Sequence, residues 1–230
     1  MTFPEVKALT FDIYGTVLDL TSGLSPIIED FLEARRARVS ARQFWADWRA
    51  RQRIEQFQDT IMMLGHSGYL ETARRACVYA LRLHGFEGSP REQEALMRGW
   101  SRLSPFPDVL PALRRLESSY RLVALSNGEE RYLDEVIRDR IGFEFTEALS
   151  VDMVGRFKPH PSVYRRTATL LGLEVGQCMM VSSHAFDVAG ARACGFKGAY
   201  VNRYELPFDD SPYLPQLTVG DFTELAAALL

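Results

Sequence analysis

The chain has 230 residues, of which 47% are hydrophobic and 25% charged, and its formal net charge is −3. This length and composition predict a globular protein with a sizeable core, arranged as one domain or as a core with an insertion. No run of like charges and no apolar segment of bilayer-spanning length occurs, so we expect no nucleic acid and no membrane as partner, and a cytoplasmic location.

The first predicted element is a strand at residues 6–11, an apolar run that ends at Asp12. A tight turn containing Gly15 and Thr16 follows it. A carboxylate at the carboxyl end of a buried strand lies where open α/β sheets bind and transform their ligands. Asp12 is therefore the first candidate for a reactive group, although an Asp after a strand is also a common turn former.

Residues 18–100 are predicted to be helical, with breaks at glycine and serine. This part contains no lysine, so its permanent cations are arginines, whose planar guanidinium suits bidentate contacts with anions. Arg49 and Arg53 lie one turn apart in the amphipathic second segment and share a helix face. The predicted helices are 26–36, 41–64, 70–83 and 90–102.

From residue 107 onward, strands alternate with helices, which indicates βαβ units and a parallel sheet. We therefore predict an α/β fold with a Rossmann-like parallel sheet core, residues 1–17 and 101–230, and helices on both faces. A helical cap, residues 18–100, is inserted after the first strand as a lid. The predicted strands are 120–125, 147–151, 177–181, 198–201 and 217–219, and the helices are 108–116, 131–138, 161–171, 187–194 and 222–229.

Four connections leave the carboxyl edge of the predicted sheet with polar groups. Each is weak evidence in isolation, because Ser-Asn-Gly is first of all a turn and an Asp can simply cap a helix. Together they bring a carboxylate nucleophile, hydroxyl and amide donors, an ammonium and a second carboxylate to one edge. The connections are D-x-Y-G-T at 12–16, S-N-G at 126–128, K-P at 158–159 and S-S-H-A-F-D at 182–187.

These stretches resemble the haloacid dehalogenase superfamily, and specifically its L-2-haloacid dehalogenase (type II) branch. The resemblance is carried by FDIYGTVLD, WRARQ, RLSPFPDV, LSNG, FKPHPSVY and VSSHAFDVAGAR. The S-N-G and K-P motifs belong to the whole superfamily, whereas Tyr14, Arg49, Tyr164 and S-S-H-A-F-D point to the dehalogenase branch.

The resemblance implies a hydrolase acting on carbon–halide bonds, an (S)-2-haloacid dehalogenase. A short-chain L-2-haloacid and water would give the D-2-hydroxyacid and halide through an aspartyl ester, without metal or other cofactor. It also implies that the chain can form a homodimer. Tyr14 stands where a metal-dependent phosphatase of the superfamily would carry a second Asp, so the chain lacks one expected magnesium ligand.

The same resemblance assigns the catalytic residues. Asp12 would attack the carbon that bears the halogen and form the ester. Lys158 would lie beside Asp12 and favour its ionised form, with support from Tyr164. Asp187, together with Ser182, would orient or deprotonate the water that hydrolyses the ester.

The substrate-binding residues follow in the same way. Arg49 would meet the departing halide with help from Asn127, and Ser126 would hold the substrate carboxylate together with backbone amides after Asp12. Phe186 would form an apolar wall, and the ring of Tyr14 would line the pocket while largely buried.

Two positions depart from the pattern of the branch. His184 occupies a position usually held by Asn, next to the hydrolytic water, and its imidazole is larger and can exchange a proton. Arg53 lies where relatives tend to carry an apolar pocket residue, so either Arg49 or Arg53 could be the one that points inward. We favour Arg49 because it follows Trp48.

Two other functions compete with this interpretation. The first is a magnesium-dependent phosphomonoesterase of the same superfamily, which Tyr14 and the single carboxylate of S-S-H-A-F-D disfavour, because magnesium prefers several carboxylate and phosphate oxygens. The second is a protein that binds a small anion without turnover, which the complete set of Asp12, Ser126, Lys158 and Asp187 disfavours.

Overall fold

The computed structural model describes residues 3–63 and 65–230. The chain forms two compact units, Met1–Leu18 with Pro105–Leu230, and Asp19–Ser104. We refer to them as the sheet unit and the helical unit. That the helical unit acts as a lid stays a prediction.

The sheet unit is built on a six-stranded sheet in which every neighbouring pair is parallel, with the order β3-β2-β1-β4-β5-β6. This is a Rossmann-type order, and it confirms the predicted α/β class. β1 lies between β2 and β4, with Phe11 opposite Ala124 and Val181. The strands are β1 Ala8–Phe11, β2 Arg121–Ser126, β3 Glu147–Ser150, β4 Cys178–Ser182, β5 Lys197–Val201 and β6 Leu217–Val219.

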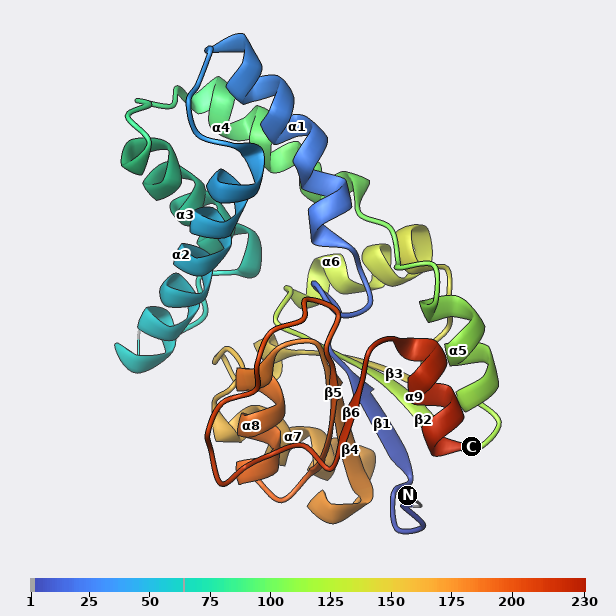
Figure 1. Ribbon diagram of the computed structural model, residues 1–230. Coiled ribbons are helices and arrows are strands. Elements are labelled where there is room, and N and C mark those ends of the chain that lie inside the picture. The colour runs from blue at the N-terminus through green and yellow to red at the C-terminus, as the bar shows by residue number, and fades with distance from the viewer. Residues whose placement is uncertain (1–2, 64) are drawn as a thin grey trace. The chain divides into compact units, whose positions relative to one another are not determined.

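Helices cover both faces of this sheet. α7 and α8 lie on one face, and α5 and α9 on the other (Figure 1). The helices are α5 Val109–Leu116, α6 Glu130–Glu135, α7 Pro161–Leu171, α8 Ala185–Ala193 and α9 Phe222–Leu229. A π-helical segment, Val136–Ile141, continues α6 and ends at Gly142, whose φ of 69° suits glycine.

The core of the sheet unit explains why β1 reads as an unbroken apolar run. All four residues of β1 are buried because both faces of the sheet are covered, as is usual for central parallel strands. Val123, Met180, Phe157 and Phe196 belong to one buried cluster on this sheet. Each such side chain contributes roughly 1.5–3 kcal/mol by leaving water, so the strand that carries Asp12 is firmly held at its end.

The helical unit contains α1 Leu20–Ala34, α2 Ala41–Ile61, α3 Tyr69–Leu83, α4 Pro90–Met97 and a 3₁₀ turn at Arg98–Arg102. α1 begins six residues before the predicted start at residue 26, so Pro26 lies inside the helix. The reason is the side chain of Asp19, which accepts a hydrogen bond from the backbone N–H of Ser22 and fixes the helix start there.

α2 ends three residues before the predicted limit, Leu64, which itself lies outside the described residues. Met63 follows the helix with a φ of 54°, a left-handed conformation that stops it. Inside the unit, Trp48 packs against Trp100 in a tilted arrangement with ring centroids 5.2 Å apart, and its indole N–H donates to the carbonyl of Ala73. These aromatic contacts hold α2 against α3 and the 3₁₀ turn.

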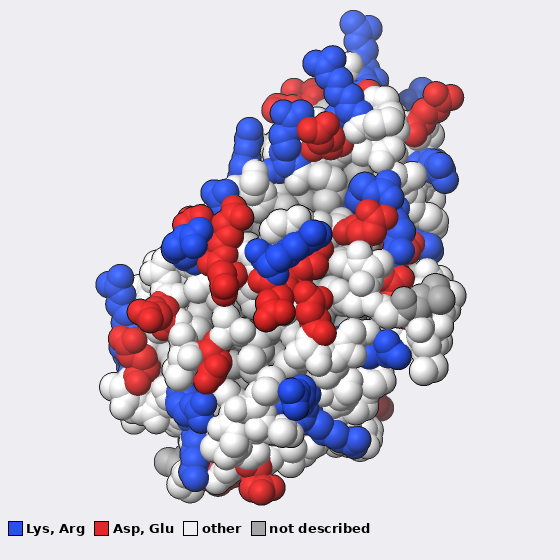
Figure 2. Space-filling model, turned by 180° about the vertical axis from the view of Figure 1, so that it is seen from behind, with Lys and Arg blue, Asp and Glu red and all other residues white. Residues whose placement is uncertain are grey.

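Both signs of charge are interspersed on the face drawn in Figure 2, without a large field of one sign. This agrees with the small net charge of the sequence. Among the described residues, no helix combines the length and the apolar character needed to cross a bilayer.

Candidate active site

The site is centred on Asp12, the first residue after β1. Its backbone N–H donates to the carbonyl of Val181, which continues the ladder between β1 and β4 by one residue. The side chain is only 7% exposed. One carboxylate oxygen, Oδ1, accepts from the ammonium of Lys158 at 2.8 Å, and the other, Oδ2, accepts from the hydroxyl of Thr16 at 2.7 Å. The strand end thus presents a carboxylate whose two oxygens are both oriented.

Lys158 joins the groups that come from separate strand ends. Its ammonium donates to Asp12 Oδ1, to Asp187 Oδ2 and to the carbonyl of Leu125, at 2.8, 2.8 and 2.9 Å. An ammonium has three N–H donors, so each of them has a partner. The side chain is 1% exposed. A buried cation between two buried carboxylates leaves the trio with a net charge of −1 when both acids are ionised.

The two carboxylates respond in opposite directions to this arrangement. Burial raises the pKa of Asp12, but attraction to Lys158 and His184 and hydrogen bonds from Lys158 and Thr16 outweigh it, so the pKa lies below the ordinary value. Burial and repulsion from Asp12 raise the pKa of Asp187 despite the same ammonium. Two acids with separated pKa values are suited to different tasks, a nucleophile and a base.

Tyr164 fixes the second carboxylate. Its hydroxyl donates to Asp187 Oδ1 at 2.8 Å, while Lys158 takes Oδ2. Burial and the neighbouring Asp187 raise the pKa of the phenol well above its ordinary value, so it remains a donor. Asp187 lies in the first turn of α8 and is fully buried. Lys158, Tyr164 and the two acids thus form one hydrogen-bonded group in which Tyr164 bonds to Asp187, and their catalytic roles stay predictions.

The predicted polar residues at the other strand ends lie at the same edge, where they form hydrogen bonds that build the turns. Ser126 Oγ accepts from the N–H of Gly128, and Asn127 Oδ1 accepts from the N–H of Lys158, both at 2.9 Å. Ser182 Oγ accepts from the N–H of His184 at 3.1 Å. These contacts hold the loops that carry the ammonium and the imidazole.

Tyr14 packs beside the S-N-G turn. A Cβ added at Gly128 would lie 2.9 Å from Cε2 of Tyr14, so glycine is required for this close approach. The ring is 7% exposed, which agrees with a largely buried aromatic residue at this position.

His184, the unusual residue of the S-S-H-A-F-D stretch, lies close to the nucleophile. Its Nε2 is 3.8 Å from Asp12 Oδ2 and 3.1 Å from the carbonyl oxygen of Tyr14. A carbonyl can only accept, so Nε2 carries the proton in this contact. The ring of Phe186 stacks on the imidazole with an interplanar angle of 6°.

Three further residues of this site were not among the predicted ones. Thr16 bonds directly to Asp12, and the hydroxyl of Tyr204 and the guanidinium of Arg203 reach the backbone of the turn after Asp12. Thr16 lies in the same D-x-Y-G-T motif. Arg203 and Tyr204 follow β5, so the position rule that identified the other four connections applies to this fifth one as well.

Arg49, the predicted halide-binding residue, belongs to α2 in the helical unit. Its guanidinium donates to Gln52 Oε1 at 2.8 Å and to the hydroxyl of Tyr69 at 3.3 Å, within that unit. Arg53 follows one turn later, and both side chains are partly buried. The choice between the two arginines stays a prediction.

Metal ligands are sparse at these strand ends. Within residues 3–63 and 65–230, no three or more His, Cys, Asp or Glu side chains are grouped so that they could hold a metal ion. Asp12 directs its two oxygens at Lys158 and Thr16, and Tyr14 supplies no carboxylate two residues later.

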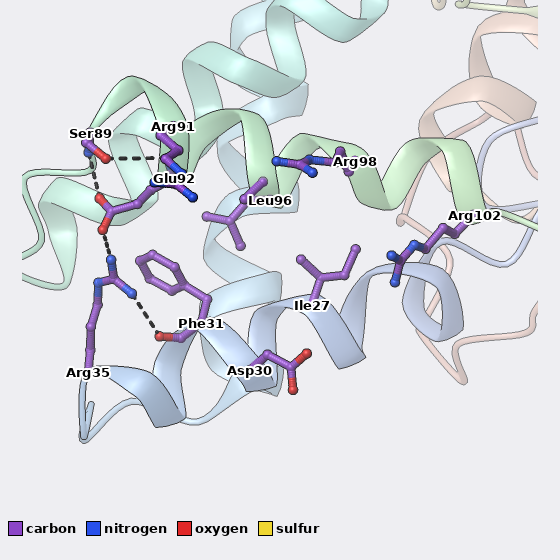
Figure 3. A pocket seen from close by; sticks show the side chains of 11 residues that line it. Ile27, Asp30, Phe31, Arg35, Ser89, Arg91, Glu92, Leu96, Arg98 and Arg102 are labelled. Carbon is purple, nitrogen blue, oxygen red and sulfur yellow. Dashed lines mark hydrogen bonds and ion pairs between the residues drawn. The ribbon is translucent and has the colours of Figure 1, made fainter.

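A separate hollow of about 600 Å³ lies in the helical unit between α1 and α4 (Figure 3). Phe31 and Leu96 supply apolar walls, and Arg35 pairs with Glu92 at one end. Glu92 also completes a capping box with Ser89 at the start of α4. These contacts are those of helix capping and helix pairing, and none of the predicted site residues lines the hollow.

The chain is similar to known proteins over most of its length. The family model of the haloacid dehalogenase-like hydrolases matches residues 6–195. The chain is 31% identical over 220 residues to haloacetate dehalogenase H-2 of Moraxella sp. (strain B), and the matched region covers 94% of each protein. It is 31% identical over 218 residues to an (S)-2-haloacid dehalogenase of Pseudomonas sp. (strain YL), covering 93% of this chain and 90% of that protein.

A solved structure is similar over nearly the whole chain. It is that of L-2-haloacid dehalogenase from Xanthobacter autotrophicus with chloropropionic acid covalently bound. The TM-score is 0.80 with 25% sequence identity, over 96% of this chain and 97% of that one.

Proposed function

The chain belongs to the haloacid dehalogenase-like hydrolases, and we propose that it hydrolyses short-chain 2-haloalkanoic acids. The observation that carries the proposal is the buried trio in which Lys158 holds Asp12 and Asp187 at 2.8 Å each. The covalently bound chloropropionic acid of the Xanthobacter relative supports an ester intermediate.

In the first step, an oxygen of Asp12 attacks the carbon that bears the halogen. A carbon–oxygen bond forms, the carbon–halogen bond breaks, and the halide leaves with the bonding electrons. The attack requires an ionised carboxylate, which the lowered pKa of Asp12 supplies. Lys158 and Thr16 orient the carboxylate before the substrate arrives, so little reorganisation is needed.

In the second step, water hydrolyses the ester. Asp187 takes a proton from the water, the oxygen adds to the carboxyl carbon of Asp12, and the bond to the alkyl oxygen breaks. The product leaves as the 2-hydroxyacid after its oxygen regains a proton, and Asp12 keeps one oxygen from water. Ester formation also removes the negative charge of Asp12, which is one of the causes that raise the pKa of Asp187. Asp187 is therefore more readily ionised at the step that needs a base. The ammonium of Lys158 then stabilises the charge of Asp187 alone.

The remaining roles follow from the resemblance and rest on it. Ser126 and backbone amides after Asp12 hold the substrate carboxylate, Arg49 and Asn127 receive the halide, and Ser182 assists the water. Tyr14, Phe186 and His184 line the pocket, and Tyr164 supports Lys158 through Asp187. The (S)-2-haloacid is the proposed substrate and the D-2-hydroxyacid the product. No metal takes part in either step.

The test is halide release from the two enantiomers of 2-chloropropionate, with and without a chelator. We expect release from the (S) enantiomer, unchanged by the chelator. With enzyme in excess in water enriched in ¹⁸O, the first product should carry ordinary oxygen and Asp12 the heavy isotope, as mass spectrometry of the peptide would show. Heavy oxygen in the first product would contradict the ester.

Two other outcomes would replace the proposal. Chelator-sensitive release of phosphate from a phosphomonoester, with no halide, would favour a magnesium-dependent phosphatase. Neither activity, with small anions still bound, would favour a binding protein. A homodimer stays a prediction, which sedimentation would test.

A further inference from the structure

Three successive carbonyl oxygens after the nucleophile each accept a hydrogen bond from a side chain. Tyr14 O accepts from His184 Nε2 at 3.1 Å, and Gly15 O accepts from the hydroxyl of Tyr204 at 2.8 Å. Thr16 O accepts from Arg203 Nε at 3.1 Å. Backbone carbonyls in a turn usually bond to other backbone groups or to water. Because side chains from other segments bond to three successive carbonyls of this turn, the orientation of each of these peptide planes is fixed.

The donors of these bonds are themselves held. Arg203 forms a bidentate pair with Asp108 at 3.1 and 2.7 Å, and its guanidinium lies 4.0 Å from the ring centre of Phe106. A bidentate pair against an aromatic face leaves an arginine little freedom. Its hydrogen bond to Thr16 O is therefore directed and not incidental.

His184 is held by a stack of rings. Its imidazole is nearly parallel to the rings of Phe186 and Tyr204, with ring centroids 5.6 and 6.4 Å away and interplanar angles of 6° and 3°. Phe186 comes from α8, and Tyr204 follows β5. The imidazole N–H and the phenol hydroxyl donate to two adjacent carbonyls.

The turn itself has no room to adapt. Gly15 has a φ of 94°, and a Cβ there would lie 3.0 Å from His184 Nε2 and 3.3 Å from the hydroxyl of Tyr204. Thr16 Oγ1 accepts from the N–H of Ser183 at 2.9 Å and donates to Asp12 Oδ2 at 2.7 Å. The position of the Thr16 hydroxyl, and through it the rotation of the Asp12 carboxylate, depends on this turn.

We propose that His184, Tyr204 and Arg203 are positioning residues that clamp the carbonyls of residues 14–16 and thereby aim the carboxylate of Asp12 through Thr16. The proposal rests on the proposed function, because a carboxylate that attacks carbon must present one lone pair along one line. It also gives His184 a role that does not need proton exchange, since its Nε2–H is used as a donor to a carbonyl.

The first test compares two hydroxyl deletions. Tyr204→Phe removes the donor to Gly15 O but keeps the ring. Tyr200→Phe is the matched control, because the Tyr200 hydroxyl also donates to a backbone carbonyl, that of Leu206, at 3.4 Å. We expect kcat for the haloacid to fall about tenfold in Tyr204→Phe, with KM changed less than about twofold, and little change in Tyr200→Phe. Both variants should unfold at similar temperatures.

The second test asks for rescue at His184. Glutamine can place an N–H donor about where Nε2 lies, whereas leucine cannot. We expect His184→Gln to keep kcat within about threefold and His184→Leu to lose about tenfold or more. Equal losses in the two variants would show that the ring alone matters and would overturn the role given to the N–H.

A third measurement does not depend on the substrate. The N–H of Gly15 donates to Leu18 O at 2.9 Å inside the turn, and its hydrogen exchange reports how often the turn opens. We expect roughly tenfold faster exchange at Gly15 in Tyr204→Phe, and no change in Tyr200→Phe. Unchanged exchange together with unchanged kcat would overturn the clamp. If the unsubstituted enzyme released no halide, the proposed function would fail, while the exchange result would still decide whether the clamp exists.

Discussion

In each of the two units a cation lies between two carboxylates, and these two cations differ in burial. In the sheet unit, Lys158 lies 2.8 Å from both Asp12 and Asp187, and is 1% exposed. In the helical unit, Arg75 lies 3.1 Å from Glu55 and 2.8 Å from Asp59, and is 31% exposed. Glu55 also pairs with Arg51, and both carboxylates of this cluster are largely buried, so the main contrast is that the lysine has lost its water and the arginine has not.

The clusters also differ in how the chain brings them together. Glu55 and Asp59 are one turn apart on α2, and Arg75 comes from α3, the neighbouring helix. Such a cluster holds two neighbouring helices together, and forming it costs little free energy. The members of the buried trio come from three separate strand ends, and taking them out of water costs several kcal/mol per ion. A cluster that costs this much without needing to stabilise the fold is best explained by chemistry.

The largest effect is expected for Asp12→Asn. The amide keeps the shape but lacks the charge needed to attack carbon, so halide release should fall by roughly 10⁴-fold or more. Halide release and circular dichroism would be measured on the same preparation. Full activity in a folded variant would remove Asp12 from the mechanism.

Lys158→Met should affect both stability and activity. Methionine fills the volume but leaves two buried carboxylates facing each other, so we expect unfolding free energy to fall by about 3–5 kcal/mol. Halide release should be lost, because the pKa of Asp12 would rise without the ammonium. Urea unfolding and activity assays check this. A stable and active variant would show that the buried trio matters no more for stability and activity than the cluster around Arg75.

Arg49→Gln should lower kcat/KM for the haloacid by about 10²-fold, since charge stabilisation of the departing halide would be lost. Arg53→Gln is the matched control, one turn further along α2. We expect a smaller loss there. A larger loss in Arg53→Gln would exchange the roles of the two arginines.

The pH dependence of kcat/KM reports Asp12. Because its pKa is lowered by Lys158, His184 and Thr16, Asp12 stays ionised to lower pH than an ordinary aspartate, and the acid limb of kcat/KM for ester formation lies correspondingly low. The hydrogen bond from Thr16 is one cause of the lowering, so Thr16→Val should raise this pKa and move the acid limb to higher pH. Initial rates across the acid range, with folding checked at each pH, decide the direction. An unmoved limb would mean that the Thr16 bond does not act on Asp12.

The smallest effect is expected for Arg75→Met in the helical unit. Arg75 is partly exposed, and without it Glu55 keeps its pair with Arg51 and Asp59 its bond from Ser67, so the loss should cost about 1 kcal/mol of unfolding free energy and leave halide release unchanged. The same unfolding and activity assays apply. A cost as large as that of Lys158→Met would mean that burial is not what separates the two clusters.

Much of the fold could be predicted because its signals are local. The apolar run of β1 and the alternation of strands and helices are periodic patterns that depend on near neighbours in sequence. The prediction for α1 was wrong at its start, because the side chain of Asp19 caps the helix before Leu20 and not at residue 26. Proline usually marks a helix start, but here a side-chain cap and a buried apolar stripe decide it.

The site was predicted less completely, because hydrogen-bond partners are not periodic. The positions after strands identified the residues at the edge. They did not indicate which hydrogen-bond partner each polar atom would have. Ser126, Asn127 and Ser182 accept from backbone N–H groups of their own edge, which no motif indicated. Tyr204 follows β5, where the same position rule applies, but no motif indicated the bond that its hydroxyl makes to Gly15.

The sequence by itself determined that Asp12 ends a buried strand, and that Lys158 and Asp187 follow other strand ends. The tertiary structure alone decided that Thr16 orients Asp12 and that residues 184, 203 and 204 reach the turn behind it. Those last contacts join residues 170 to 189 positions apart. The physical reason is that such contacts depend on the order of strands in the sheet, where β1 lies between β2 and β4, and not on any local pattern.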